Sequence, residues 1–240
     1  MSVFVSMFSG PRNISTTMMR AFENRPDARV VDEPFYASYL AESGADHPYR
    51  EETLRSQPQT RQAALEQIKT GAGDTPIIFE KHIAHHLPLD MTLDWLADRR
   101  VFILIRDPRA MVASYSKKYD DVAPIIDSSS VQRRIYEDCM RRDVPCPVVD
   151  AADALRAPRA MLASLCDALN IEFKEQMLSW PSGPRDSDGP WAPHWYDAVR
   201  ASTGFRPLKD QAIALTPALE SLAAQMADNY SFFHKNRIMV

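Results

Sequence analysis

A cluster of cationic and hydroxyl-bearing side chains follows the first apolar segment of the chain. Arg12 is followed at short spacing by Ser15, Thr16 and Thr17. These residue types bind anions, because a guanidinium supplies charge and hydroxyls supply hydrogen-bond donors. At the start of a helix, unpaired backbone N–H groups and the helix dipole add to the attraction. The pattern predicts a phosphate-binding loop.

A strand and a helix must hold this loop. Residues 3–8 form an apolar run typical of a buried strand, and residues 10–11 (Gly-Pro) turn the chain. Met18, Met19 and Phe22 then share one face of a helix. The loop is not a Walker loop, because the sequence contains no Gly-Lys pair. An ordinary strand-to-helix turn with a Ser/Thr cap is the alternative interpretation.

A second candidate anion site follows another apolar run. Residues 101–105 are continuously apolar, as expected for a central parallel strand covered on both faces. The run ends at Arg106, Pro108 suits the first helical position, and Ser114 lies eight residues after Arg106. An Arg at the carboxyl end of a parallel strand points into the crevice where open α/β sheets bind ligands. The alternative is an Arg106 that pairs with its neighbour Asp107.

Together the two elements resemble the sulfotransferase family, which uses 3′-phosphoadenosine 5′-phosphosulfate (PAPS). In that family the first strand-loop-helix holds the 5′-phosphosulfate, and an Arg and a Ser spaced like Arg106 and Ser114 hold the 3′-phosphate. Arg12 falls where many members carry a loop Lys, and residues 15–16 (Ser-Thr) fall on the two family hydroxyls. The segments SGPRNIST and DEPF are similar to a branch of small proteins in the family. The resemblance extends from the first strand to about Phe205.

The resemblance implies further nucleotide contacts from less typical positions. Asn13 and Thr17 belong to the same loop, although Thr17 replaces an aromatic residue that stacks on adenine in the family. The Arg-Lys-Gly motif, whose loop covers the 3′-phosphate, is missing, and Arg185 is its nearest remnant. The implied co-substrate is PAPS, with no metal.

Acidic and basic side chains at the ends of two further strands are the candidates for proton transfer. Glu33 follows the strand 28–32, and Pro34 favours an extended residue before it. In some sulfotransferases a Glu at this position is the catalytic base; the alternative is a charge at the start of the next helix. Lys81 and His82 follow the strand 76–80 and are similar to a family Lys-x-His pair whose His deprotonates the acceptor, although the intervening residue is missing. The alternative for Lys81 is a solvated surface position.

Two more histidines, His85 and His86, follow His82 closely. A metal site is not expected, because the spacing lacks a helical His-x-x-x-His pair and no carboxylate ligand is evident. His85 and His86 are instead expected at a helix start or at the edge of the core.

Composition limits the class of protein. The formal charge of −4 provides no basic face for nucleic acid, and three cysteines without a C-x-x-C pair argue against a disulfide scaffold or zinc site. The first apolar run lacks a basic lead and is too short for a signal or membrane segment, so a cytoplasmic protein that contacts no membrane is expected. The expected partners are a small-molecule acceptor and, as the candidate assembly, a second copy in a homodimer.

Alternating strand and helix patterns predict a single α/β domain over residues 1–240. By the resemblance it is a three-layer fold like that of P-loop NTPases, with a five-stranded parallel sheet in the order 2-3-1-4-5. The expected strands are 3–8, 28–32, 76–80, 101–105 and 147–150. The expected helices include 35–41, 59–69, 92–99, 128–141 with Ser128 as its cap, 158–169, and a last one that starts at 216–217.

The implied activity is sulfuryl transfer from PAPS to a hydroxyl or amine of a small molecule. Charge builds on the leaving oxygen, where Arg12 and Lys81 can stabilise it, and Glu33 or His82 can take the acceptor proton. Two alternatives remain: an ATP-dependent P-loop phosphotransferase, and a non-catalytic nucleotide-binding protein of the same fold.

Overall fold

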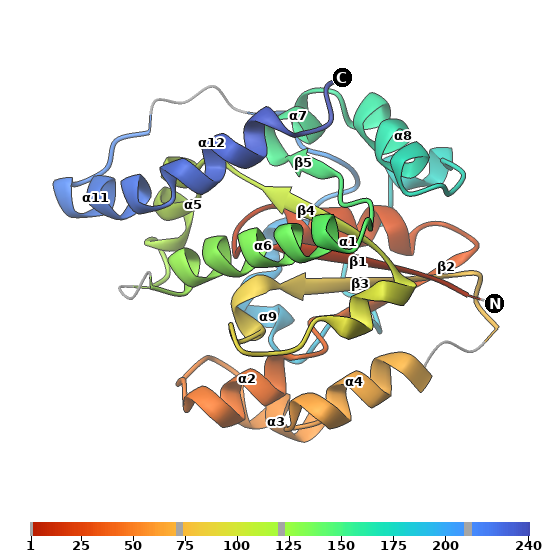
Figure 1. Cartoon of the computed structure of the whole chain (residues 1–240), viewed down its shortest axis with the longest axis horizontal. Helices are drawn as coiled ribbons and strands as arrows, with labels where there is room; N and C mark the ends of the chain where they lie inside the picture. The colour runs from red at the N-terminus through yellow and green to blue at the C-terminus, as the bar shows by residue number, and fades with distance from the viewer. Residues whose placement is uncertain (1, 71–73, 120–122, 209–212) are drawn as a thin grey trace.

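The computed structural model describes residues 2–70, 74–119, 123–208 and 213–240. It contains a five-stranded sheet in the order β2-β3-β1-β4-β5, with every neighbouring pair parallel (Figure 1). The predicted fold and strand order are therefore confirmed. The strands are β1 (Val3–Ser9), β2 (Ala28–Asp32), β3 (Ile77–Ile83), β4 (Arg99–Ile105) and β5 (Val148–Asp150).

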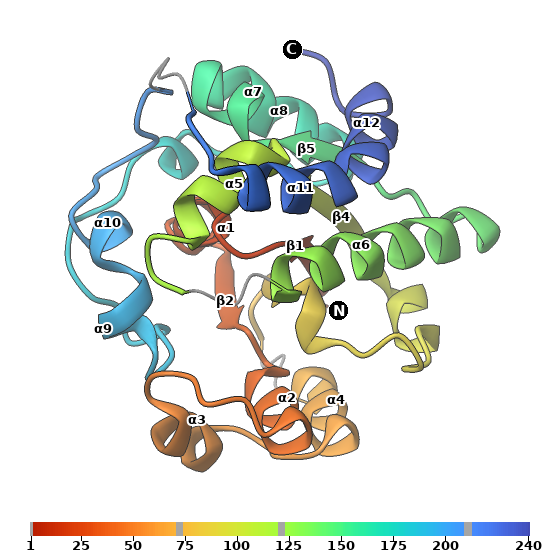
Figure 2. The same ribbon diagram turned by 90° about the vertical axis from the view of Figure 1, so that its left-hand side faces the viewer.

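Helices cover both faces of the sheet, and further helices surround the edge at which the strands end (Figures 1 and 2). The α-helices before β4 are α1 (Ser15–Glu23), α2 (Tyr36–Ser43), α3 (Arg50–Ser56) and α4 (Arg61–Thr70). Those after it are α5 (Pro108–Tyr115), α6 (Ala123–Arg141), α7 (Ala151–Arg156), α8 (Pro158–Ala168), α9 (Ala192–Trp195), α10 (Asp197–Arg200), α11 (Pro217–Gln225) and α12 (Ala227–Lys235). Short 3₁₀ turns lie at η1 (Ala84–His86), η2 (Asp94–Asp98) and η3 (Glu175–Leu178). None of the helices within the described ranges is long and apolar enough to cross a bilayer.

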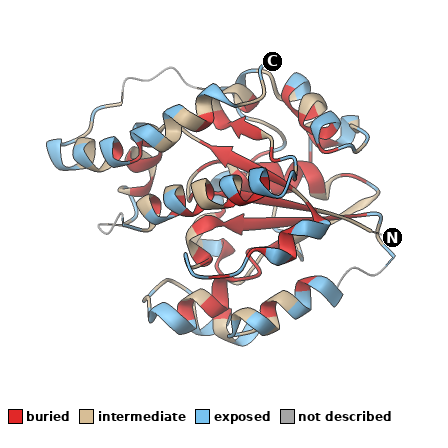
Figure 3. Ribbon diagram, viewed as in Figure 1, coloured by how far each residue is buried: buried red, intermediate tan, exposed pale blue. Residues whose placement is uncertain are grey.

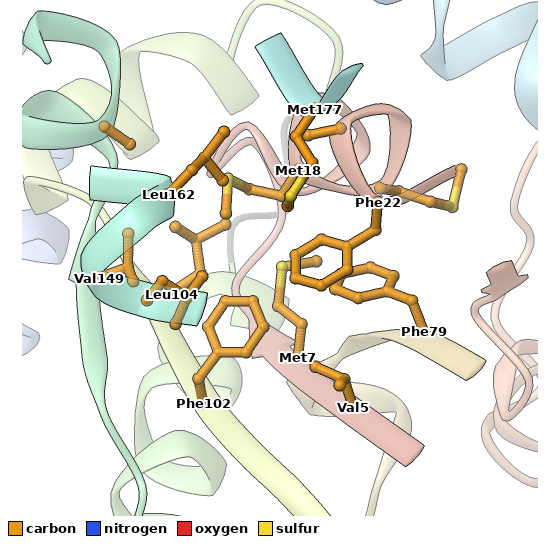
Figure 4. Close-up of a cluster of buried hydrophobic side chains, with 14 of the residues drawn as sticks. Val5, Met7, Met18, Phe22, Phe79, Phe102, Leu104, Val149, Leu162 and Met177 are labelled. Atoms are coloured by element: carbon orange, nitrogen blue, oxygen red, sulfur yellow. The ribbon is translucent and has the colours of Figure 1, made fainter. Parts of the chain in front are cut away.

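Two apolar clusters occupy the two faces of the sheet, because successive strand residues point to opposite sides. On one face, Met7, Phe79 and Phe102 pack against Met18 and Phe22 of α1 (Figure 4). On the other face, Phe8 and Ile103 belong to the cluster that contains Ile135 of α6. β3 and β5 are wholly buried between these layers and β1 and β4 largely so, whereas β2 at the edge of the sheet is only half-buried up to Asp32 (Figure 3).

Most predicted elements are present, and the differences have local causes. β3 continues to Ile83, beyond the expected end at residue 80, because Glu80, Lys81 and His82 are each paired in the interior. Residues 94–98 form only a 3₁₀ turn, since β4 already begins at Arg99. Thr216, where the last helix was expected to start, caps α11, and Asp107 caps α5; the side chains of both accept a bond from a backbone N–H group.

Ser128 is not a helix cap, which corrects the prediction. α6 begins at Ala123, so Ser128 lies inside the helix and is buried. Its hydroxyl instead bonds to Nδ1 of His85 at 2.8 Å. The long helix thereby contacts the η1 turn at the carboxyl end of β3.

A buried ion cluster around Glu80 joins β1, β3 and β4. Glu80 accepts bonds from Ser6 at 2.6 Å and from Arg99 at 3.0 and 3.2 Å, and it lies 3.4 Å from Nε2 of His82. Burial alone would raise the pKa of Glu80, but His82 and Arg99 outweigh it and hold the pKa below its usual value. These groups are on the strand face away from Lys81, and they serve the packing of the sheet.

We expect Glu80→Gln to lower the free energy of unfolding by about 3–5 kcal/mol at pH 7, because it leaves Arg99 buried without its carboxylate. The pKa of Glu80 is lowered in the folded state, so its stabilisation is complete above the unfolded value of about 4.3 and is lost as the pH falls through the folded value. Urea titrations of both proteins should therefore differ most at neutral pH and converge in acid. A gap that does not change with pH would contradict this role.

Candidate functional site

A pocket of about 600 Å³ opens at the carboxyl edge of the sheet. Figure 2 looks toward this edge, which is surrounded by α2, α5, α9 and α10. The pocket walls come from the loop after β1, the start of α2, the end of β3, α5 and the segment 195–208. The parallel arrangement brings these distant segments together because all strand carboxyl ends meet at one edge.

The loop after β1 forms one end of the pocket and has the geometry of an anion site. Arg12 and Ile14 have φ angles of 63° and 58°, in the left-handed region that non-glycine residues rarely adopt. Ile14 precedes α1 and its apolar side chain cannot cap the helix, so the first N–H groups of α1 remain available to a ligand. Ser15, Thr16 and Thr17 line the pocket beside them.

Two guanidinium groups face this end of the pocket. Arg12 Nε donates to Ser114 Oγ at 3.1 Å, and Arg106 donates to the Arg12 carbonyl oxygen. Burial lowers the pKa of both arginines, and for Arg106 the nearby charge of Arg12 lowers it further. Their bonded partners here are neutral oxygens, so the positive charge is available to an anionic ligand. The structure thus brings together Arg12, Arg106 and Ser114 as predicted.

Asn13 lies behind the loop. Its side chain is buried and donates to the Leu104 carbonyl oxygen of β4 at 3.2 Å, and it is absent from the described pocket lining. The side chain of Asn13 thus fixes the loop to the neighbouring strand, and a ligand contact of Asn13 stays a prediction.

The middle of the pocket contains a buried ammonium group between two carboxylates. Lys81 Nζ lies 2.8 Å from Asp32 Oδ1 and 2.5 Å from Glu33 Oε1. The Tyr196 hydroxyl accepts from Lys81 at 2.5 Å and from the Trp191 indole at 3.0 Å, and it donates to Asp32. Burial would lower the pKa of Lys81, but the two carboxylates outweigh it and raise the pKa. Lys81 is thus a fixed cation, which rules out the solvated surface position.

Glu33 lies directly after β2, at the rim of the sheet, but in the left-handed region and not in the extended conformation expected before Pro34. Its φ of 46° is strained, and its backbone is held by bonds to Lys81, Tyr36 and Gln57. Burial raises the pKa of the Glu33 carboxyl, with Lys81 opposing this rise and Asp32 adding to it. A carboxylate with a raised pKa in a pocket is suited to accept a proton.

His82 is on the other face of the sheet. Its ring stacks on Phe8 at 4.7 Å, its Nε2 faces Glu80, and it is absent from the pocket lining. Burial lowers its pKa. Because strand side chains alternate, Lys81 and His82 cannot both face the pocket. This placement argues against the expected role of His82 as a base.

His85 and His86 line the pocket instead, although only structural positions were expected for them. The η1 turn directly after β3 places the His86 ring beside Tyr36 and Tyr39 of α2, and the His85 ring beside Tyr39. Burial lowers the pKa of His85 to about 3 and that of His86 well below its usual value, so both are neutral. The sequence does contain one indication of this placement. His85 and His86 come directly after a strand, and the carboxyl ends of parallel strands form the edge of the sheet where ligands bind.

Arg185, the nearest remnant of the missing motif, is not among the residues that line the pocket. It donates to the Pro181 carbonyl at 2.7 Å and lies 3.8 Å from Glu23. Two other cations, Lys117 and Arg206, line the pocket and were not singled out in the sequence. Over the described residues, no group of His, Cys, Asp or Glu side chains could hold a metal ion.

Residues 3–220 match the model of a family described as a sulfotransferase domain. The chain belongs to this sulfotransferase family. Two curated relatives from Arabidopsis thaliana, branched-chain-amino-acid aminotransferase-like proteins 2 and 1, are 36% and 35% identical over 201 residues, or 84% of this chain. The chain spans 36% of the length of each, so it corresponds to about a third of those proteins.

Solved sulfotransferase domains share the fold. The domain from the Synechococcus PCC 7002 olefin synthase aligns with a TM-score of 0.59 at 19% identity, covering 96% of this chain and 95% of that domain. The domain from the curacin biosynthetic pathway also aligns with a TM-score of 0.59, at 14% identity, covering 96% and 98%. At these identities the likeness concerns the fold alone.

We expect Lys81→Met to lower the free energy of unfolding by about 3–5 kcal/mol at pH 7, because Asp32 and Glu33 lose the cation between them. The pKa of Lys81 is raised in the folded state, so its stabilisation is complete below the unfolded value of about 10.4 and is lost as the pH rises through the folded value. Denaturant titrations should show a constant gap near neutral pH that narrows above pH ~10.4. Equal stability of the two proteins at pH 7 would contradict the ion cluster.

Proposed function

We propose that this sulfotransferase-family chain transfers a sulfuryl group from PAPS to a small-molecule acceptor. One observation carries the proposal: the cationic loop and the Lys81–Glu33 pair open into the same pocket. An anionic sulfuryl donor bound at the cationic loop would place its reacting group beside the Lys81 ammonium and the Glu33 carboxylate. Sulfuryl transfer needs this combination, since charge grows on the leaving oxygen while the acceptor loses a proton.

The nucleotide would bind along the cationic end of the pocket. The start of α1, with Arg12 and the hydroxyls of residues 15–17, suits the 5′-phosphosulfate. Arg106 and Ser114 suit the 3′-phosphate, and Lys117 and Arg206 add positive charge to the same pocket. Lys117 and Arg206 are the candidates to compensate for the missing Arg-Lys-Gly motif. Because Arg12 and Lys81 supply the cationic charge, the reaction has no need of a metal ion.

Glu33 is the proposed general base. Its second carboxylate oxygen, Oε2, points away from the one bonded to Lys81 and toward His86. The Lys81 ammonium already donates to three oxygens, so its proposed part is to supply positive charge near the leaving oxygen and to orient Glu33, while direct hydrogen bonds to that oxygen come from Arg12 and the start of α1.

We expect Arg106→Ala to weaken binding of the desulfonated product PAP by about 2 kcal/mol or more, since charge-assisted bonds contribute about 1.5–3 kcal/mol each. Binding of AMP, which lacks the 3′-phosphate, should change little. Isothermal titration of both nucleotides provides the measurement, with Arg109→Ala on the exposed side of α5 as the matched control. Equal losses for PAP and AMP would assign Arg106 to another role.

We expect Glu33→Gln to lower the turnover rate about 10²–10⁴-fold, because it retains the shape of the side chain but removes the base. PAP affinity should remain near that of the unchanged protein. His82→Asn, measured in parallel on folded protein, separates the two bases considered from the sequence, because His82 lies outside the pocket. If Glu33→Gln keeps the full rate, the acceptor is deprotonated by another group.

A further inference from the structure

Asp32 is a buried carboxylate that the proposed transfer leaves without a role. Its side chain is 2% exposed, and it is not among the residues that line the pocket. It accepts hydrogen bonds from Lys81 Nζ at 2.8 Å, from the Tyr196 hydroxyl at 2.8 and 2.9 Å and from the Gly189 backbone N–H at 3.2 Å. A carboxylate held in this way acts on the reaction through the groups that it contacts.

The Tyr196 hydroxyl joins the charged groups of this cluster. It accepts from Lys81 Nζ at 2.5 Å and from the Trp191 indole at 3.0 Å, and it lies 3.4 Å from Glu33 Oε1. A hydroxyl has one proton to donate, and the shorter contacts direct it to Asp32 rather than to Glu33. Tyr196 therefore stabilises the Asp32 carboxylate beside Lys81.

The position of Lys81 between two carboxylates determines how Glu33 binds a proton. Burial raises the pKa of Glu33, Lys81 opposes this rise, and Asp32 adds to it. With the ammonium to itself, Glu33 would stay ionised but would hold a proton weakly. With no ammonium, burial would keep it protonated and unable to accept one. A general base works best between these limits, with a pKa near the operating pH.

The second carboxylate also matters at the moment when Glu33 takes up a proton. Neutral Glu33 no longer balances the ammonium, and a buried cation without a counter-ion is strongly unfavourable. Asp32 Oδ1 lies 2.8 Å from Lys81 Nζ, so a negative charge stays beside the ammonium throughout. Asp32 thereby makes it easier to move the acceptor proton onto Glu33.

Besides Lys81, the titratable groups that face Glu33 from other elements are uncharged near neutral pH, among those that the structure describes. His86 Nδ1 of η1 lies 3.8 Å from Glu33 Oε2, and burial holds the pKa of His86 well below its usual value. Burial and nearby carboxylates raise the pKa of Tyr36 on α2 and that of Tyr196, so both phenols keep their protons. The charge that acts on Glu33 therefore comes from the ammonium and the second carboxylate.

We propose that Asp32 and Tyr196 are positioning residues that divide the Lys81 ammonium between two carboxylates and thereby set how strongly Glu33 holds the acceptor proton. This rests on the proposed sulfuryl transfer, in which Glu33 accepts that proton. Asp32 acts through the ammonium that it shares, and Tyr196 acts by holding the Asp32 carboxylate next to that ammonium.

The proton affinity of Glu33 is measured directly in protein that carries ¹³C at its glutamate carboxyl groups. The chemical shift of the Glu33 signal follows protonation of the carboxyl, and the signal is assigned by its absence from Glu33→Gln. Titrations compare the unchanged protein with Asp32→Asn and Tyr196→Phe, which keep the shapes of the side chains. Asp98→Asn is the matched control, because Asp98 is exposed and precedes β4 at the opposite edge of the sheet. PAP affinity is measured for each protein by isothermal titration.

We expect Asp32→Asn to lower the pKa of Glu33 by about one pH unit or more, because the ammonium then serves Glu33 alone and a neighbouring negative charge is gone. We expect Tyr196→Phe to raise it by about half a pH unit, because Asp32 loses a donor and competes more strongly for Lys81. Asp98→Asn should leave it unchanged, since solvent and salt screen an exposed charge. PAP affinity should stay the same in all variants.

Opposite shifts separate the proposal from a structural role. A cluster that only loosened would admit water and move the pKa of Glu33 toward its usual value of about 4.3 in both variants. Shifts in the same direction, an unshifted titration in either variant, or loss of the fold in both would each overturn the proposal. Failure of the unchanged protein to bind PAP would overturn the proposed function instead, while opposite shifts of the Glu33 titration would still show the division of the ammonium.

Discussion

The site depends on one buried cation, Lys81, held between carboxylates from the neighbouring strand. Asp32 and Lys81 are directly paired in the parallel register of β2 and β3, so the ladder itself brings the charges together. Glu33 follows Asp32 and turns away from the strand with a positive φ, which directs its carboxyl to the same ammonium group. An ammonium buried to this degree requires such partners, because its desolvation is otherwise prohibitive. The fold therefore brings Lys81 and the two carboxylates together, and the same contacts offset the cost of burying the charges.

The cluster also connects the pocket to a segment far along the chain. Tyr196 reaches Lys81 and Asp32 from the turn between α9 and α10, and the Gly189 backbone N–H donates to Asp32 at 3.2 Å. Arg20 of α1 pairs with Asp188 in the same segment. The loop-rich region 179–196 is thus tied to the sheet by charged and polar bonds, and its residue Trp195 lines the pocket.

The sequence predicted the elements more fully than the details of the site. Apolar runs and turn residues were sufficient for the five strands, and Arg106, Ser114 and the loop at residues 12–17 were placed correctly in relation to one another. The distinction between His82 and His86 was not accessible, because it depends on which residue of β3 faces which layer and on the 3₁₀ turn after Ile83. Asp32 and Tyr196 were missed because their roles arise from register and from contacts across 164 residues of sequence. Arg206 was missed because the remnant of the Arg-Lys-Gly motif was expected at Arg185, which precedes Trp191 in the sequence, and not after it.

The central claim is that this pocket accepts a nucleotide with a 3′-phosphate and not a triphosphate. Isothermal titration of the purified chain with PAP and with ATP, without metal and then with Mg²⁺, tests it most directly. We predict one PAP per chain, bound at least tenfold more tightly than ATP under both conditions, because the site offers arginines and a helix start but no Walker lysine. Binding of ATP as tight as that of PAP, or dependence of PAP binding on Mg²⁺, would contradict the account.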